Sequence, residues 1–487
     1  MKEINDEIFA EDSEDFTISD DFSEQMPISP EEREVSAEDV EQLIAKRAYA
    51  ELRALTETMP AVDMAELFAN LTPRYRLVLF RLLPKEQAAA IFVEMDAELW
   101  RELVESFNDS ELAAILDEMY LDDTVDMIEE MPAAVVKRIL RASKPEDRAV
   151  INRLLHYDRD SAGALMTTEY VRLRPQMTVG EALVQIRKVA IDKETIYTCY
   201  VTDSERHLLG IVTARSLLLH PAETVLEDIM EENVMFVRTT DDREECARMF
   251  DKYGFIALPV VDSERRLVGI VTVDDAMDVI REETEEDFAK MAAVIPTETP
   301  YLRTSAFTIF KSRIPWLLLL MISATFSSMI LSRFEAALPA VLVLFVPMLM
   351  DTGGNSGGQS SVTVIRAMSL GEVRPRDALR VVWKELRIGI VSGIILGGVA
   401  LLKVLLVDRL IMGNPSVSIT VAVTVALALA LTVIMAKLIG ATLPILAKLV
   451  GFDPAVMASP IITTLVDALA LLLYFAIAAS FVGIVVA

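Results

Sequence analysis

The C-terminal part of the chain contains five long apolar runs, at 314–332, 337–365, 388–407, 417–440 and 457–486. Each run is near or above the ~20 residues that an α-helix needs to cross the hydrocarbon core of a bilayer. A segment in lipid must satisfy its backbone polar groups internally, so these runs can fold only as membrane-spanning helices. The sequence therefore predicts a domain of five transmembrane helices at 311–487.

Charge divides the chain near residue 300. Residues 1–300 contain 66 Asp and Glu against 32 Lys and Arg, whereas residues 301–487 contain 8 against 14. An acidic soluble part repels nucleic acid and favours cations, so no nucleic-acid partner is expected. We predict that residues 1–34 are a disordered acidic tail. The 2 cysteines and 3 histidines are too few and too scattered for a soft-metal cluster, and few cysteines fit a reducing cytosol.

Basic residues near the predicted spans indicate the orientation of the chain. Eleven lie on the side of the N-terminal part, and three lie on the other side: Arg333, Lys403 and Arg409. Because Lys and Arg in short loops stay in the cytoplasm, the N-terminal domains are expected there and the C-terminus outside. The expected location is a bacterial plasma membrane that the chain crosses five times.

Asp467 is the polar residue deepest in the last apolar run. It lies about ten residues into the run, roughly 15 Å along a helix and near the membrane midplane. A charge there costs at least ~2.5 kcal/mol, so Asp467 is expected to face a watery cavity or a cation. The alternative is a protonated Asp bonded to a neighbouring Thr or Ser. Pro460, Ser459, Thr463 and Thr464 precede it and add oxygens.

The stretch MDTGGNSGGQSS, at 350–361, interrupts the second run with glycines and polar residues. We predict that the helix breaks here and offers carbonyl and amide oxygens along a water-filled path, because irregular backbone at membrane depth is tolerated only there or inside protein. The alternative is close helix packing, since Gly353/Gly357 and Gly354/Gly358 have small-xxx-small spacing. Oxygen ligands with one carboxylate suit a hard cation such as Mg²⁺.

Residues 35–157 have apolar positions at spacings of three and four between Pro or polar breaks, which predicts a solenoid of short amphipathic helices. Asp122 and Asp126 are four apart and so share one helix face. An internal repeat follows: TDSERHLLGIVTARSLL at 202–218 matches VDSERRLVGIVTVDDAM at 261–277. Each copy is predicted to fold as strand, turn, strand and helix, with Thr213 or Thr272 as the N-cap.

The segment DDAMDVIREETEEDFAK, at 274–290, contains eight acids and two bases. On a helix its acids form like-charge pairs at i, i+4, which destabilise the helix. Bound cations could relieve this repulsion; the alternative is a merely solvated helix.

These features together resemble the MgtE family of magnesium transporters and channels, over nearly the whole chain. The most specific residues are TGGN at 352–355 with Gln359 and Ser360, and SPIITTLVD at 459–467; the repeat resembles a pair of CBS motifs. The resemblance implies an all-α N domain (35–157), an α/β CBS pair (158–222 and 223–282), an acidic connecting helix (283–310) and the membrane domain. It also implies a homodimer with a Mg²⁺ path on its axis.

The resemblance implies roles for particular residues. The implied ion path contains Asp467 together with Gly353, Gly354, Asn355, Gly357, Gly358, Ser459, Pro460 and Thr463. The implied Mg²⁺-sensing residues, which close the path when internal Mg²⁺ is ample, are Asp122, Asp126, Asp275, Asp278, Glu283, Glu286, Asp287 and Asp453. An adenine nucleotide such as ATP is implied at the CBS pair, with Arg215 and Asp275 as its ligands. Ser216 replaces the corresponding acid of the first repeat, so at most one nucleotide site is complete.

Three positions depart from the family pattern. Ser459 and Gly358 stand where relatives have Asn, and Asp351 stands where relatives often have Gly. Asp351 is interpreted either as a second acid at the mouth of the path or as a helix cap.

Other classes of protein fit less well. The chain has no GxxxxGK[ST] loop and no catalytic His, Cys or Ser constellation, so it is not expected to be an enzyme or an ATP-driven importer. The remaining alternatives are a membrane-anchored CBS nucleotide sensor and a broader divalent-cation transporter for Co²⁺ or Mn²⁺.

Overall fold

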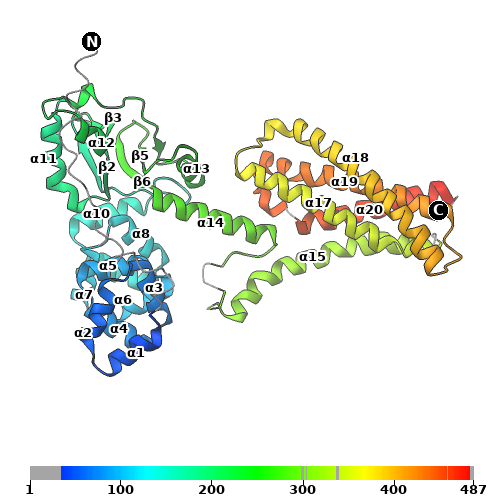
Figure 1. The fold of residues 1–487 in the computed structure, drawn as a ribbon, viewed down its shortest axis with the longest axis horizontal. Helices are drawn as coiled ribbons and strands as arrows, with labels where there is room; N and C mark the ends of the chain where they lie inside the picture. The colour runs from blue at the N-terminus through cyan, green and yellow to red at the C-terminus, as the bar shows by residue number, and fades with distance from the viewer. Residues whose placement is uncertain (1–34, 298–300, 303, 336–338, 458, 483–487) are drawn as a thin grey trace, which may run out of the picture. The chain divides into compact units, whose positions relative to one another are not determined.

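The structure is a computed structural model that describes residues 35–482 except 298–300, 303, 336–338 and 458. The predicted acidic tail at 1–34 lies outside the described residues. The chain divides into two compact units, Met1–Asp242 with Ile256–Thr272, and Arg243–Phe255 with Val273–Ala487. The first unit contains the helical domain and the strands of the repeat. The second contains two helices of the soluble part and the apolar helices (Figure 1).

Short helices fill residues 37–154, as the apolar spacing predicts. Polar caps start several of them: Ser36 accepts from Asp39 N, and Asn108 forms a capping box with Glu111. Four phenylalanines, Phe68, Phe80, Phe92 and Phe107, pack against one another inside the solenoid. The helices are α1 (Ala37–Ala45), α2 (Tyr49–Glu57), α3 (Ala61–Asn70), α4 (Pro73–Leu82), α5 (Lys85–Val93), α6 (Ala97–Ser106), α7 (Asp109–Leu116), α8 (Leu121–Glu130), α9 (Ala133–Ala142) and α10 (Pro145–Leu154).

The repeat folds into two matching three-stranded sheets, which confirms the predicted strand-turn-strand-helix pattern. In each sheet a first strand is parallel to the second, and the second is antiparallel to the third. The strands are β1 (Tyr170–Leu173), β2 (Thr195–Thr202), β3 (Leu208–Thr213), β4 (Val237–Arg238), β5 (Ala257–Val261) and β6 (Leu267–Thr272). Helices α11 (Val179–Val189) and α12 (Ala214–Leu219) cover the first sheet, and Thr213 caps α12 as predicted.

The two copies of the repeat join through their hairpin turns. Leu208 N donates to Arg265 O at 3.2 Å, and Leu267 N donates to Arg206 O at 2.8 Å. Both Arg206 and Arg265 adopt left-handed backbone conformations, with φ of 74° and 63°. The reciprocal bonds hold these turns in a conformation that arginine seldom adopts.

The second unit begins with α13 (Arg243–Tyr253) and the acidic helix α14 (Val273–Met291). Helix α14 therefore starts before residue 283 and ends at Met291, so the predicted connecting segment at 283–310 includes only the end of this helix. Helices α15 (Ala306–Glu335), α16 (Ala340–Val343), α17 (Val346–Ser369), α18 (Ala378–Lys403), α19 (Ile419–Val450) and α20 (Ser459–Val482) follow.

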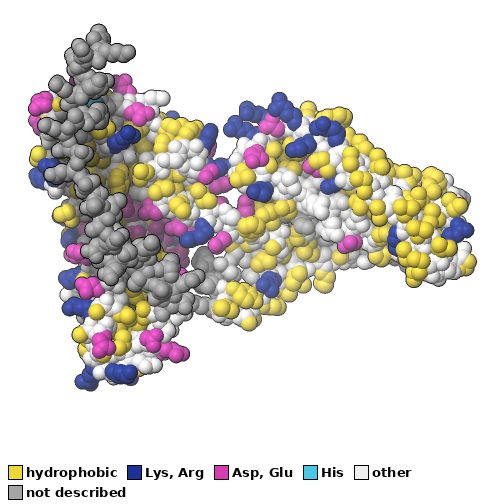
Figure 2. All heavy atoms as spheres, in the orientation of Figure 1, with side chains coloured by type: hydrophobic (Ala, Val, Ile, Leu, Met, Phe, Trp, Pro, Cys, Tyr) yellow, Lys and Arg dark blue, Asp and Glu magenta, His cyan; other side chains and the backbone are white. Residues whose placement is uncertain are grey.

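Four helical segments of the described residues are long and apolar enough to cross a membrane: Ala306–Phe334, Pro375–Ile411, Ile419–Val450 and Pro454–Phe481. Helix α17 is as long as α20 but contains the glycine-rich stretch and is less apolar. The count of five spans therefore stays a prediction. Lys and Arg gather over the start of α18, and hydrophobic side chains cover most of the visible surface elsewhere in this unit (Figure 2). This distribution agrees with a membrane helix bundle that has one basic end.

The predicted helix break at 350–361 is wrong. Helix α17 runs without interruption from Val346 to Ser369. The glycines are needed for close approach instead: a Cβ at Gly353 would lie 2.8 Å from Thr432 Cγ2, and one at Gly440 would lie 2.2 Å from Gly357 O. Because this backbone pairs within the helix, close packing of small residues explains the stretch better than an unwound segment.

Candidate ion path and cation sites

Helix α17 has two faces of opposite character. Gly353, Gly354 and Gly357 are buried against α19 and α20, whereas Asp351, Asn355 and Gln359 are exposed. The exposed residues are four apart, so they form one polar stripe along the helix. The stripe faces away from the helices that pack on α17 in the same chain.

Asp467 lies on α20 next to this stripe. Its Oδ1 atom is enclosed and accepts no hydrogen bond from the residues that the structure describes. Asp351 is the charged group whose field acts on Asp467. One turn before Asp467, the Thr463 methyl group lies where a Cβ at Gly354 would approach it to 2.7 Å, which fixes α20 against α17. An enclosed carboxylate oxygen without a hydrogen-bond donor is costly unless a cation or water satisfies it.

The residues predicted to line the path divide between the interior and the surface of the bundle. Gly353, Gly354, Gly357 and Gly358 are buried, and their carbonyls belong to a continuous helix, so they are packing residues and offer no freed carbonyls. Asn355 is exposed on the polar stripe, and Pro460 and Thr463 are half-buried on α20. The Ser459 side chain lies outside what the structure describes.

Among the described residues of the bundle, two buried charged side chains belong to no site that the sequence predicted. Glu385 on α18 is 7% exposed and accepts a hydrogen bond from Ser360 Oγ on α17 at 2.7 Å. Lys437 on α19 is likewise 7% exposed. The bond between Ser360 and Glu385 adds a polar contact that holds the polar helix α17 beside α18.

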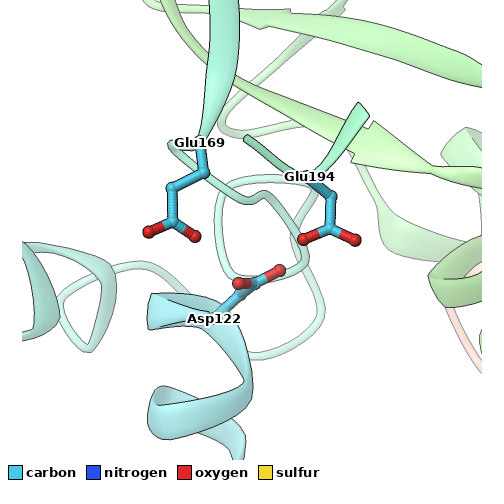
Figure 3. Close-up of side chains that lie close together, drawn as sticks. All are labelled: Asp122, Glu169 and Glu194. Carbon is cyan, nitrogen blue, oxygen red and sulfur yellow. The ribbon is translucent and has the colours of Figure 1, made fainter. Parts of the chain in front are cut away.

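Three acids of the first unit converge on one point (Figure 3). Asp122 from α8, Glu169 just before β1 and Glu194 just before β2 have carboxylate oxygens that all lie within 4.8 Å of one another. All three side chains are half-buried, and Leu121 N donates to Glu169 Oε2 at 3.4 Å. Carboxylates this close repel unless a proton or a cation joins them, so the cluster has the chemistry of a divalent-cation site.

Only Asp122 of this cluster was predicted. Asp126 lies on the same helix but is exposed and outside the cluster. Glu169 and Glu194 are separated by a whole strand and helix, and neither belongs to a run of acids. Their approach to α8 depends on how the helical domain packs on the repeat.

Burial, followed by the charge of Asp122, raises the pKa of Glu169 from 4.5 to about 7. In protein free of divalent ions, the folded state should lose stability as the pH rises between these two values. In that interval the group ionises in the unfolded chain but stays protonated in the folded chain. Below this pH interval Glu169 does not lower the free energy of unfolding, and above the interval it lowers that free energy by a constant amount.

We expect Glu169→Gln to abolish this part of the pH dependence. The measurement is the melting temperature of the purified full-length chain with a chelator, across the interval from pH 4.5 to about 7. The exposed Glu227→Gln is the control and should keep the wild-type slope. An unchanged slope in Glu169→Gln would show that Glu169 is not the responsible group.

Helix α14 places its acids against basic side chains of its own unit. Glu282 and Glu283 pair with Arg243 of α13 at 3.2 and 3.0 Å. Lys290 Nζ pairs with Glu286 and with Asp453, at 2.6 Å in both cases. Arg243 and Lys290 therefore relieve part of the repulsion between these acids, and cation binding on this helix stays a prediction. The sequence pattern identified the acids, but it did not identify Arg243 as a partner.

A cavity of about 320 Å³ lies beside this cluster, lined by Glu283, Asp287, Lys290 and Asp453 among others. Ser369 Oγ, at the end of α17, donates to Asp287 at 2.9 Å. Burial raises the pKa of both Glu283 and Asp287. The acidic helix, the end of α17 and the loop before α20 therefore meet at one acidic cavity. Glu286 joins them through Lys290.

Comparison with known families accounts for this order of domains. The family MgtE, described as a divalent cation transporter, matches residues 346–477; the MgtE intracellular N domain matches 59–160; and the CBS domain matches 162–223 and 226–282. The magnesium transporter MgtE of Thermus thermophilus is 37% identical over 432 residues, which are 88% of this chain and 94% of that protein. The chain belongs to the MgtE family.

A second MgtE relative agrees. The magnesium transporter MgtE of Bacillus subtilis is 32% identical over 434 residues, covering 89% of this chain and 94% of its own. Among solved structures, the cytosolic domain of the Mg²⁺ channel MgtE in complex with ATP is 38% identical and covers 50% of this chain and 99% of its own, with a TM-score of 0.48.

Three other residues implied by the MgtE resemblance, Asp278, Arg215 and Asp275, lie on α14 and α12. Asp278 pairs with Arg281 at 2.8 Å on the outer part of α14. Arg215 is exposed in the first turn of α12, in the first unit, whereas Asp275 lies on α14 in the second.

Proposed function

We propose that this chain imports Mg²⁺ across the bacterial plasma membrane as a homodimer, with Asp467 as the carboxylate of the ion path. The observation that carries the proposal is the polar stripe of Asp351, Asn355 and Gln359, exposed on α17 beside the enclosed Asp467. Carboxylate and amide oxygens are ligands that Mg²⁺ accepts, usually with several of its waters retained.

The exposed stripe supports a dimer. In lipid, a row of polar side chains on the outer face of a helix is costly, and such residues normally face a bundle interior or a watery cavity. A second copy related by two-fold symmetry would place its own stripe and Asp467 opposite the first. Water and Mg²⁺ would then occupy the space between the copies, and two carboxylates would balance the ion's charge.

The experiment is flux of Mg²⁺ into proteoliposomes that contain the purified full-length chain. Saturable Mg²⁺ uptake is expected, and its absence would favour a membrane-anchored CBS nucleotide sensor. Competition by Co²⁺ and Mn²⁺ in the same vesicles measures whether the path is selective for Mg²⁺ or serves divalent cations more broadly.

We further propose that internal Mg²⁺ closes the path by binding the carboxylates of Glu283, Glu286, Asp287 and Asp453. The cavity that three of them line supports this role. Mg²⁺ can shift the equilibrium only by the difference in its affinity for the closed and open states. In the N domain, Asp122 with Glu169 and Glu194 is a second candidate site for the same ion. ATP or another adenine nucleotide at the CBS pair remains a proposal that rests on Arg215 and Asp275.

A substitution of Lys290 tests this proposal, because it should change the Mg²⁺ concentration needed for closure in a known direction. Its ammonium occupies the space between Glu286 and Asp453, 2.6 Å from each, so a Mg²⁺ ion that binds there must displace it. We expect Lys290→Met to lower the inner-face Mg²⁺ concentration that halves the flux by about tenfold, which corresponds to ~1.4 kcal/mol. Lys290→Arg keeps the charge and should resemble the wild type.

The opposite change should have the opposite effect. Neutralising Glu283, Glu286 and Asp287 together should leave the path conducting when inner-face Mg²⁺ is raised to the millimolar range. Patch currents of the three variants, recorded with Mg²⁺ varied on the inner face, make the comparison. If Lys290→Met instead needs more Mg²⁺ for closure, Lys290 tethers the closed state and does not compete with the ion.

A further inference from the structure

A cavity of about 390 Å³ in the first unit is lined by three arginines that belong neither to the ion path nor to the cation sites. Arg153 comes from α10 of the helical domain, Arg172 from β1 of the first repeat, and Arg206 from the turn between β2 and β3. Thr168 and Tyr170 add hydroxyl groups to the same cavity. The cavity thus joins the helical domain to the repeat.

The three guanidinium groups are exposed, and none has a carboxylate within ion-pairing distance among the described residues. Elsewhere in the helical domain, arginines have such partners: Arg81 pairs with Glu111 at 2.9 Å, and Arg159 pairs with Glu129 at 2.8 Å. The soluble part has about twice as many acids as bases, so three unpaired arginines around one cavity are unusual. The charges of Arg172 and Arg206 both act on the phenol of Tyr170.

Rigid backbone positions two of these arginines. Arg172 lies in β1, paired with Tyr200 of β2, and its side chain shares a strand face with Tyr170. Arg206 has a left-handed backbone, with φ of 74°, and its carbonyl accepts from Leu267 N at 2.8 Å. Tyr170 Oη donates to Leu267 O at 3.2 Å, which holds the phenol of this cavity in place.

The second repeat contains a matching group that serves as an internal comparison. Phe236 and Arg265 stand where the first repeat has Arg172 and Arg206, because Thr167 pairs with Ile270 in the same way that Glu231 pairs with Ile211. There the Arg265 guanidinium lies over the Phe236 ring, 5.1 Å from its centroid. The first group differs in having the guanidinium of Arg172 in place of the phenyl ring and in adding Arg153 from α10.

We propose that the cavity of Arg153, Arg172 and Arg206 binds the phosphate chain of a polyphosphate or a nucleoside polyphosphate. Guanidinium groups match phosphate oxygens with paired hydrogen bonds, and three of them suit a ligand with several phosphates. The volume lies within the ~300–1,000 Å³ typical of small-molecule sites. A bound phosphate chain would link α10 to the repeat.

This site is distinct from the nucleotide site implied by the family resemblance. The residues implied for that site, Arg215 and Asp275, follow the Thr213 and Thr272 ends of β3 and β6 in the sequence. The arginine cavity lies at the other end of β6, where Val268 lines it. At about 3.3 Å per residue, the two ends of this strand are roughly 16 Å apart.

The test is calorimetric titration of the purified full-length chain with inorganic tripolyphosphate, ATP and adenosine. Tripolyphosphate and ATP should bind to the wild type and adenosine should not, since the phosphates carry the recognition. R172A/R206A should weaken tripolyphosphate binding by at least about tenfold, as expected for lost hydrogen bonds between charged groups. The control R238A/R265A removes two arginines from the second repeat and should leave binding unchanged.

The titrations with tripolyphosphate and ATP also identify the source of the phosphates. Stronger binding of ATP than of tripolyphosphate, lost in R172A/R206A but kept in R215A, assigns a nucleotide; equal binding of the two assigns an inorganic chain. The proposal is overturned if tripolyphosphate does not bind, if the control variant weakens binding equally, or if ATP binding depends on Arg215 alone. Should R172A/R206A fail to fold, R172K/R206K keeps the charge but loses the paired geometry, and should still bind more weakly than the wild type.

Discussion

Asp467→Ala is expected to abolish Mg²⁺ uptake while leaving a folded, membrane-inserted protein. The variant removes the carboxylate whose Oδ1 is enclosed and accepts no hydrogen bond from the described residues. We expect transport and stability to respond differently at this position, because an enclosed carboxylate oxygen without a hydrogen-bond donor does not stabilise the bundle. Its loss should therefore cost transport without costing stability.

The measurement is growth and isotope uptake in cells that lack other Mg²⁺ systems, with the amount of variant in the membrane measured in parallel. Asp408→Asn is the control, because Asp408 is also an acid of the membrane unit but pairs with Lys403 at 2.9 Å, beyond α18. It should transport at close to the wild-type rate. Uptake at the wild-type rate by Asp467→Ala would refute the assigned ion path.

Gly440→Ala is expected to disrupt the packing of α17 on α19. An added Cβ would lie 2.2 Å from the carbonyl oxygen of Gly357, and 2.9 Å from its carbonyl carbon. Both atoms are backbone atoms of a continuous helix, so no side chain can rotate away and the helices must separate. Overpacking of this kind costs about 3 kcal/mol.

Separation of the helices should also stop transport, since the polar stripe and Asp467 lie on the two helices that this contact positions. Thermal unfolding in detergent measures the loss of stability, and proteoliposome flux measures the loss of transport. Gly398→Ala on α18 is the matched control, because an added Cβ there meets nothing within 4 Å. It should be as stable as the wild type, and equal melting temperatures for the two variants would contradict the steric argument.

The stretch MDTGGNSGGQSS illustrates what a sequence pattern can and cannot predict. Its glycines and polar residues distinguish it from the apolar residues around it. This composition gave two alternatives, an unwound helix and a close helix contact. It could not decide between an unwound path and a tight helix contact, because glycine permits both. The deciding facts are contacts with Thr432, Val466 and Gly440, which lie on two other helices.

The cation clusters show the same limit. The acidic character of α14 could be predicted from its run of acids. The approach of Asp287 to Asp453 could be expected from the family resemblance. That Arg243 and Lys290 neutralise part of this run depends on the packing of α13 and on the loop before α20. A charge pattern along one helix does not contain the charges of its neighbours.

The sequence by itself determined the division into an acidic soluble part and an apolar helical part, the duplicated strand-turn-strand-helix unit and the position of Asp467 within the last apolar run. These features are local, because hydrophobic length and periodicity act along one stretch of chain. Tertiary structure alone decided that α17 is continuous, that its polar residues face outward beside Asp467, and that Glu169 and Glu194 join Asp122. Each of these depends on side chains far apart in sequence, which are brought together by packing that no single segment encodes.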